Sequence, residues 1–125
     1  MKDNIIQKKS FEFAIRVVNA YKYLQTEKKE FVLSKQFLRS GTSIGANVEE
    51  AIGGQSKKDF ISKISIAYKE ARETKYWVNL LKATRYLEEK EADSIINDVE
   101  ELCKILSSIL VSSKQSNSEF LIPNS

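Results

Sequence analysis

Apolar residues recur at three- and four-residue steps along most of this chain, a pattern that predicts helices with one buried face. Short polar breaks separate four such segments. In the first, from Ser10 to Leu24, the positions predicted to face the core are Phe11, Ala14, Ile15, Val18, Tyr21 and Leu24. In the second, from Glu30 to Ile52, they are Leu33, Phe37, Ser40 or Gly41, Ile44, Val48 and Ala51.

The third segment has a well-marked beginning, because Ser56 followed by Asp59 is typical of a helix N-cap. Its core positions step by four and three residues: Phe60, Ile64, Ala67, Ala71, Thr74, Val78 and Leu81. The fourth segment runs from Glu88 to Ser112, and its acidic beginning suits the positive end of a helix dipole. Its wide apolar stripe comprises Ala92, Ile95, Ile96, Val99, Leu102, Cys103, Leu106, Ile109 and Leu110.

Two glycines lie inside the second segment. Gly41 and Gly45 each cost about 1 kcal/mol relative to alanine in a helix, so one alternative is a break at residues 40–43. The apolar period stays in phase across both glycines, which favours one continuous helix. Gly53 and Gly54 then end it, since glycine is favoured at helix C-termini.

Short connections between these segments force neighbouring helices to run antiparallel. The pattern therefore predicts an all-α fold, an antiparallel up-down-up-down four-helix bundle over residues 1–113. The remaining residues, 114–125, are mostly polar and are expected to form a disordered tail. No glycine-rich phosphate loop or alternation of strands and helices indicates a nucleotide-binding fold.

The composition restricts the chemistry more than the fold. The 125 residues include no histidine and one cysteine, Cys103. This excludes Ser-His-Asp triads, Cys-His pairs and histidine-ligated zinc. Glu49 and Glu50 are adjacent and point to different faces of a helix, so they cannot act as a paired acid and base. We expect a protein that is not an enzyme and has no catalytic residues, metal or cofactor.

The chain also shows no signal peptide and no apolar run of the roughly 20 residues that a membrane span requires. We therefore expect a cytoplasmic protein without a membrane partner.

Charge is distributed unevenly. Residues 1–41 hold nine basic and four acidic side chains, residues 42–86 hold eight and five, and residues 87–125 hold three and eight. In one interpretation, the acidic last third packs beside the basic remainder, within or between chains. In the other, the basic surface meets an anionic polymer. The first interpretation is favoured, because self-complementary charge is the commoner arrangement.

The third segment carries the candidate binding residues. Lys58, Lys69 and Arg72 share one arc with Tyr76, an arrangement that suits phosphate contacts and base stacking. The alternative is a solvated flank with local ion pairs, which is favoured for a single chain. Trp77 and Leu80 lie away from the apolar seam and, with Tyr76, are candidates for a subunit interface. The alternative for Trp77 is burial against another helix of the same bundle.

The second segment is rich in small and polar residues from Gln36 to Asn47. Small residues allow close approach of another helix, and Asn47, one step from the seam, can fix the register. We interpret these residues as packing and specificity residues rather than an active site. Arg39 is expected to pair with an acidic residue of another helix.

The same region carries a family resemblance. Residues 36–51 read QFLRSGTSIGANVEEA, residues 56–60 read SKKDF and residues 69–77 read KEARETKYW. These stretches resemble the four-helix-bundle 23S rRNA intervening-sequence proteins, and the resemblance covers about residues 5–113. Accessory proteins of diversity-generating retroelements are similar to this family.

The resemblance implies a cytoplasmic bacterial protein that forms a homo-oligomeric ring, a pentamer in relatives of known structure. It also implies a basic surface that binds RNA or DNA and contacts a nucleic-acid enzyme. The candidate residues for that surface are Arg39, Lys58, Lys69, Arg72 and Lys75. The alternative is a structural or protein-partner scaffold without affinity for nucleic acid.

Overall fold

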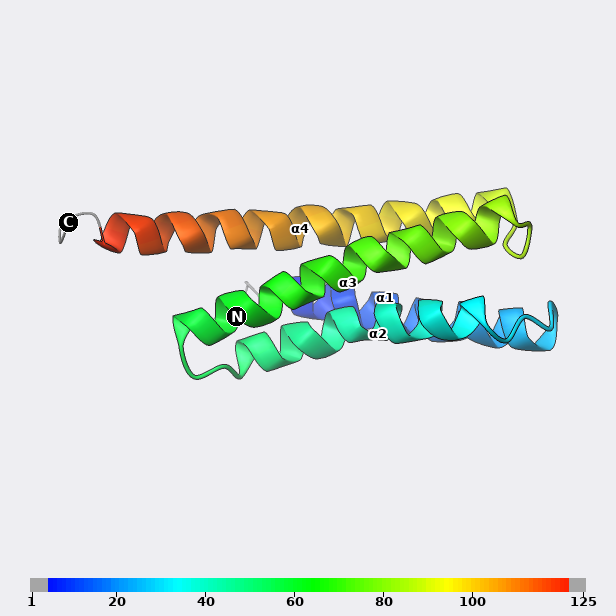
Figure 1. Cartoon of the computed structure of the whole chain (residues 1–125), viewed down its shortest axis with the longest axis horizontal. Coiled ribbons are helices and arrows are strands. Elements are labelled where there is room, and N and C mark those ends of the chain that lie inside the picture. Colours follow the sequence, from blue (N-terminus) through cyan, green and yellow to red (C-terminus); the bar gives the residue numbers. More distant parts are fainter. Residues whose placement is uncertain (1–4, 122–125) are drawn as a thin grey trace.

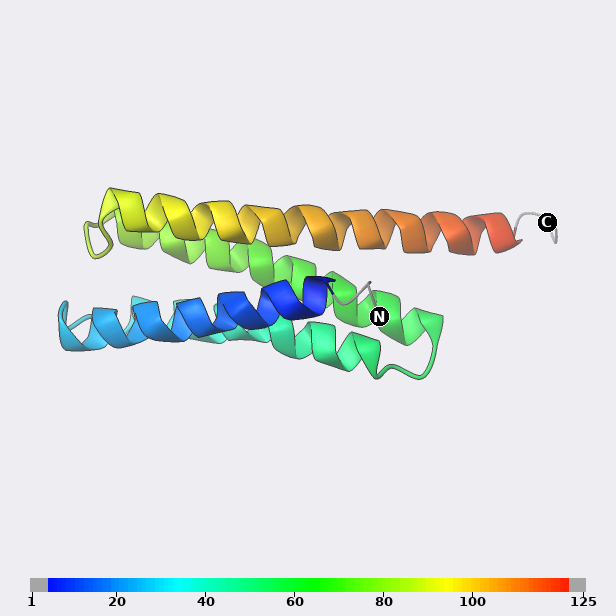
Figure 2. The same cartoon turned by 180° about the vertical axis from the view of Figure 1, so that it is seen from behind.

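The computed structural model describes the backbone of residues 5–121 and side chains as far as residue 114. Four helices make up this range, α1 (Ile5–Thr26), α2 (Leu33–Ile52), α3 (Lys57–Ala83) and α4 (Glu89–Leu121), and the described residues contain no strand (Figure 1). Successive helices pack as neighbours, whereas α1 and α4 touch only sparsely. Viewed from behind, α1 lies along α2, and α3 crosses obliquely from α2 to α4 (Figure 2). The predicted antiparallel four-helix bundle is confirmed.

The buried faces of α2, α3 and α4 are those that the apolar pattern predicts. Phe37, Ile44 and Val48 of α2 are fully buried, as are the middle and end of the α3 seam. Phe60, Leu33 and several residues of the α4 stripe pack at the edge of this core and are half-buried. The heptad-like spacing therefore identified three of the four core faces.

The face predicted for α1 is wrong. Phe11 is 66% exposed and Ile15 is 50% exposed. Of the predicted core positions only Leu24 is fully buried, and the other buried residues of the helix are Ile6, Ser10, Phe13, Val17 and Ala20. The helix carries apolar side chains on two faces, so periodicity alone could not tell which one meets the other helices.

α2 is a single helix across both internal glycines, as predicted. A Cβ atom at Gly41 would lie 2.7 Å from Cγ2 of the buried Val17, and one at Gly45 would lie 3.3 Å from the Ser10 carbonyl oxygen. The glycines therefore allow the backbones of α1 and α2 to approach closely. This contact compensates for their low helix propensity.

The beginning of α2 is set by Glu30, which the sequence pattern places inside the helix. The chain turns through a left-handed conformation at Lys29. The Glu30 carboxylate then accepts hydrogen bonds from the backbone N–H groups of Val32, Leu33 and Ser34. Burial alone would raise the pKa of Glu30, but these donors lower it below its ordinary value. The side chain thus acts as the helix cap.

The other boundaries are closer to the expected ones. Ser56 caps α3, and its Oγ accepts a hydrogen bond of 3.0 Å from the backbone N–H of Asp59, as predicted. α4 continues to Leu121, beyond the predicted end at Ser112, so the tail predicted from residue 114 begins as helix. Residues 122–125 lie outside the described residues, and the division of the chain at residue 113 stays a prediction.

Candidate functional site

α3 presents an exposed row of cations to solvent. Lys58, Lys69 and Arg72 are all exposed and lie on the same side of the helix, with Ser62 and Ser65 between them. We call Lys58, Lys69 and Arg72 the basic strip. Within the part of the chain that the structure describes, none of the three belongs to an ion pair. The strip therefore keeps its positive charge available.

The acidic residues of α4 neutralise other cations. Five of the seven ion pairs among the described residues join an α4 carboxylate to α1 or α3: Lys9–Glu101, Arg16–Glu91, Arg16–Asp98, Lys75–Glu100 and Lys82–Asp93. This confirms that the acidic last third packs beside the basic remainder of the same chain. Exposed pairs of this kind contribute little to stability. They neutralise the cations that they include, so the positive charge that remains belongs to the described cations outside these pairs.

Among the described residues, the other two candidate cations, Arg39 and Lys75, are ion-paired, unlike those of the basic strip. Arg39 lies on α2, and its Nη2 is 3.4 Å from Oε2 of Glu73, which confirms the expected pairing with another helix. Lys75 turns toward α4, and its Nζ is 2.8 Å from Oε2 of Glu100. Arg39 is therefore separate from the basic strip within a single chain, whereas Lys75 lies next to it and lines the same groove as Arg72.

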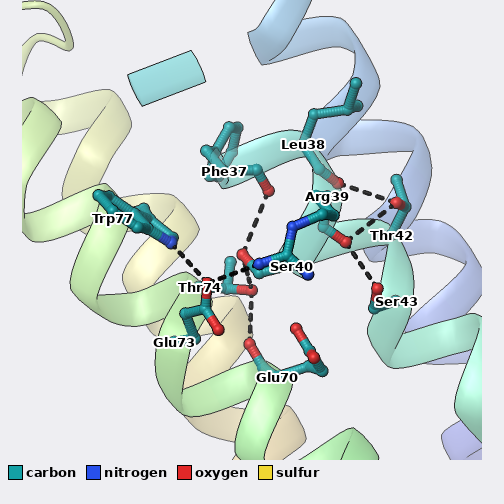
Figure 3. A network of polar contacts seen from close by, with 10 residues as sticks. All are labelled: Phe37, Leu38, Arg39, Ser40, Thr42, Ser43, Glu70, Glu73, Thr74 and Trp77. Carbon is teal, nitrogen blue, oxygen red and sulfur yellow. Dashed lines mark hydrogen bonds and ion pairs between the residues drawn. The ribbon is translucent and has the colours of Figure 1, made fainter. Parts of the chain in front are cut away.

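The small polar residues of α2 meet α3 in a hydrogen-bonded contact (Figure 3). Thr74 Oγ1 lies 2.9 Å from Ser40 Oγ, and both side chains are fully buried. Thr42 and Ser43 instead donate to carbonyl groups of the preceding turn of α2. Ser40 and Gly41 thus serve helix packing, as the sequence pattern predicts.

One carboxylate in this contact is poorly satisfied. Glu70 Oε1 is buried and has no hydrogen-bond partner among the described residues. Burial and, secondarily, repulsion from Glu73 raise the pKa of Glu70, while the charge of Arg39 acts in the opposite direction. The fold therefore disfavours the ionised form of this side chain.

Glu70→Gln is expected to increase the free energy of unfolding at pH 7 by about 1 kcal/mol. A raised folded-state pKa means that the stability contribution is complete below the unfolded-state pKa and is lost as pH rises through the folded-state pKa. In the variant this side chain should no longer lower the free energy of unfolding as the pH rises. Urea denaturation at a series of pH values from about 4 to about 8 measures the difference. Glu73→Gln is the control with the opposite sign, because Glu73 accepts from Trp77 and Arg39. Equal destabilisation by both variants would contradict this account.

The three candidate interface residues differ in accessibility. Tyr76 is 59% exposed, whereas Trp77 and Leu80 are half-buried. Trp77 packs against the core, donates its Nε1–H to Glu73 over 3.0 Å and meets the edge of the Tyr76 ring. Trp77 is thus partly covered within its own chain, and its role in a subunit interface stays a prediction.

An open groove runs between α3 and α4 beside the basic strip. It has a volume of about 660 Å³ and includes Tyr68 and Lys104, which the sequence pattern did not single out, together with Arg72, Lys75 and Tyr76. No feature of the sequence indicates that Lys104 faces α3. Its position depends on the register between the two helices.

A metal site, a membrane span and a nucleophilic cysteine are three further features that could indicate a function. In the range that the structure describes, no cluster of three or more cysteine, aspartate or glutamate side chains could hold a metal ion. None of the described helices is both long and apolar enough to cross a membrane. The half-buried Cys103 has a pKa that burial raises, which keeps the thiol protonated and weakly nucleophilic.

Comparison with known proteins agrees with the fold. The family model described as 23S rRNA-intervening sequence protein matches residues 2–108. A protein of unknown function from the S23 ribosomal protein family of Bacteroides thetaiotaomicron is similar in structure, with a TM-score of 0.86 and 57% sequence identity. The match covers 88% of this chain and 98% of that chain. No curated protein matches the chain.

Proposed function

Because this chain belongs to the 23S rRNA-intervening sequence protein family, we propose that it is a non-enzymatic, homo-oligomeric module that binds nucleic acid through the basic strip. The observation that carries this proposal is that Lys58, Lys69 and Arg72 form no ion pair with any described residue, while α4 carboxylates neutralise cations elsewhere. Exposed, unpaired cations attract the phosphate backbone and release counterions on binding. The proposed setting is the cytoplasm, and the proposed partners are further copies of this chain and RNA or DNA.

Assembly into a ring would increase the positive electrostatic potential of the basic strip. In a closed ring each copy of the strip repeats around the symmetry axis, so the positive potential adds. Arg39, which lies apart from the strip in one chain, would join the proposed surface through a neighbouring copy, and Lys75 would join it beside Arg72. A pentamer is the proposed size, following the family resemblance, and a nucleic-acid enzyme is a proposed further partner.

A ring also needs two different contact surfaces on every chain, because its interfaces are heterologous. Trp77 and Leu80 are one proposed surface, with Tyr76, which is 59% exposed in a single chain, at its edge. The outward face of α1 supplies a second, since Phe11 and Ile15 are exposed apolar residues that this chain leaves uncovered. Light scattering at micromolar concentration should give a multiple of 14.3 kDa. A monomer would contradict the ring.

The proposed nucleic-acid interface predicts a charge-specific loss of binding. Replacing Lys58, Lys69 and Arg72 with glutamine should weaken binding of a labelled RNA hairpin with single-stranded flanks at least tenfold. The salt dependence of the binding constant should fall by about 0.9 per phosphate contact removed. Mobility shifts at about 50 mM and about 200 mM salt measure both effects.

The matched control removes three cations from elsewhere. Lys28, Lys29 and Lys35 are exposed, lie at the α1–α2 turn and the first turn of α2, and change the net charge equally when replaced with glutamine. An equal loss of binding in this control would mean that only net charge matters. No binding by the unmodified protein at low salt would contradict the nucleic-acid role.

The outward face of α1 also favours a second candidate function, a scaffold that binds a protein partner and has no affinity for nucleic acid. Phe11 is 66% exposed and Ile15 is 50% exposed, so this face of α1 offers uncovered apolar surface to a partner. Stable complexes with a protein partner together with unchanged RNA mobility would support this alternative.

A further inference from the structure

The groove between α3 and α4 has the charge of an anion-binding site. Its cationic members are Arg72 and Lys75 from α3 and Lys104 from α4, and its one carboxylate is Glu100. Two positive charges therefore remain in excess. The neighbouring Cys103 adds no negative charge, because burial raises the pKa of its thiol.

Two of these cations are already positioned by the groove itself. Arg72 Nη1 donates to the Tyr68 hydroxyl over 3.4 Å, and both residues line the groove. Lys75 is 2.8 Å from Glu100, and both side chains are about two-fifths exposed. A pair that is exposed to this degree is weak, so a phosphate group can replace Glu100 as the partner of Lys75.

An aromatic ring stands at the edge of the groove. Tyr76 is 59% exposed and is thus free to stack with a planar ligand. Trp77 packs against it, with the two ring centroids 5.0 Å apart in an edge-to-face arrangement at 76°. Trp77 is fixed in turn by its hydrogen bond to Glu73. The contact with Trp77 therefore favours one orientation of the Tyr76 ring and leaves most of the ring accessible.

From this arrangement we propose that the groove binds single-stranded nucleic acid, with phosphates on Arg72, Lys75 and Lys104 and a base stacked on Tyr76. The proposal rests on the proposed nucleic-acid function and specifies the form of the ligand. Unpaired bases can present a face to an aromatic side chain, whereas duplex bases are already stacked on each other. A volume of about 660 Å³ is in the range of small-ligand sites, which suits one or two nucleotides rather than a helix.

The groove also differs from the basic strip in what it can recognise. Lys58 and Lys69 lie outside the groove and offer charge alone, so they would attract single and double strands alike. Tyr76 adds a contact that only an unstacked base can make. Preference for single strands is therefore assigned to the groove and general affinity to the strip.

The test compares a labelled single-stranded RNA oligonucleotide with a duplex of the same length, using the full chain and fluorescence anisotropy. Tyr76→Ala should weaken binding of the single strand roughly tenfold or more and change duplex binding less than about twofold. Lys104→Gln should weaken single-strand binding and lower its salt slope by about 0.7. Lys90→Gln, an exposed lysine of the same helix outside the groove, is the matched control and should change neither.

A second measurement reports on the ring directly. Trp77 is the only tryptophan and lies against Tyr76, so a base stacked on Tyr76 should quench its fluorescence. Quenching should be absent in Tyr76→Ala, whose unchanged circular dichroism spectrum would show that it folds. This signal reports on stacking at Tyr76, whereas the affinity alone also includes the contribution of Lys58 and Lys69.

The outcomes separate the two proposals. If the strip variant loses binding while Tyr76→Ala and Lys104→Gln bind the single strand normally, the groove proposal is wrong and the proposed function stands. Equal or tighter binding of the duplex, or the absence of quenching at saturation, also overturns the groove proposal. Failure of the unmodified protein to bind either RNA overturns both.

Discussion

Phe13→Ala is expected to lower the free energy of unfolding by about 4 kcal/mol. Phe13 is 3% exposed and belongs to the core face of α1. Removing its ring takes away buried apolar surface and leaves a cavity that the surrounding helices fill only in part. Urea denaturation followed by circular dichroism measures the change.

Phe11→Ala is the matched control on the same helix, two residues away. Because Phe11 is mostly exposed, its loss should change stability by less than about 0.5 kcal/mol in dilute protein. Any further effect of Phe11→Ala should grow with protein concentration, since it would act through assembly. If Phe11→Ala were the costly variant at every concentration, the face of α1 described here would be incorrect.

Gly41→Leu is expected to cost about 3 kcal/mol, at the upper end of the range for overpacked cores. Even a Cβ at this position would lie 2.7 and 2.8 Å from the two methyl groups of Val17, which is fully buried. Valine in a helix has one strongly preferred rotamer and cannot turn away. The gain in helix propensity over glycine, about 0.8 kcal/mol, is smaller than this steric cost.

Gly53→Leu provides the comparison for Gly41→Leu. Gly53 lies at the exposed end of α2 with a φ of −85°, and a Cβ there would meet only the Glu49 carbonyl oxygen at 3.7 Å. This variant should change stability by less than about 0.5 kcal/mol. Adding Val17→Ala to Gly41→Leu should give a smaller loss than the sum of the single changes, because the two side chains share one space. Additive losses would show that the contact is not the cause.

The folded chain shows which cations the acidic last third neutralises. Read along the sequence, the acidic last third could neutralise the whole basic remainder. In the structure it neutralises Arg16, Lys75 and Lys82 among others, and it does not reach Lys58 or Lys69. The modest net charge of the chain therefore understates the charge of the basic strip.

The sequence by itself determined the class of fold. Regular spacing in residues 33–110 identified three helices and their core faces, because a helix that is apolar on one side can bury only that side. The same reasoning identified the Ser56 cap and the continuity of α2 through its glycines. These are properties of single helices, which the order of residues controls locally.

Only the tertiary structure decided which face of α1 is buried, which cations stay unpaired and how the groove is composed. α1 has two apolar faces, and the choice between them depends on where Gly41 and Gly45 let α2 approach. Lys104 joins Arg72 and Tyr76 only through the register of α4 against α3. Such relations arise from the packing of several helices at once, and no periodicity within one segment contains that information.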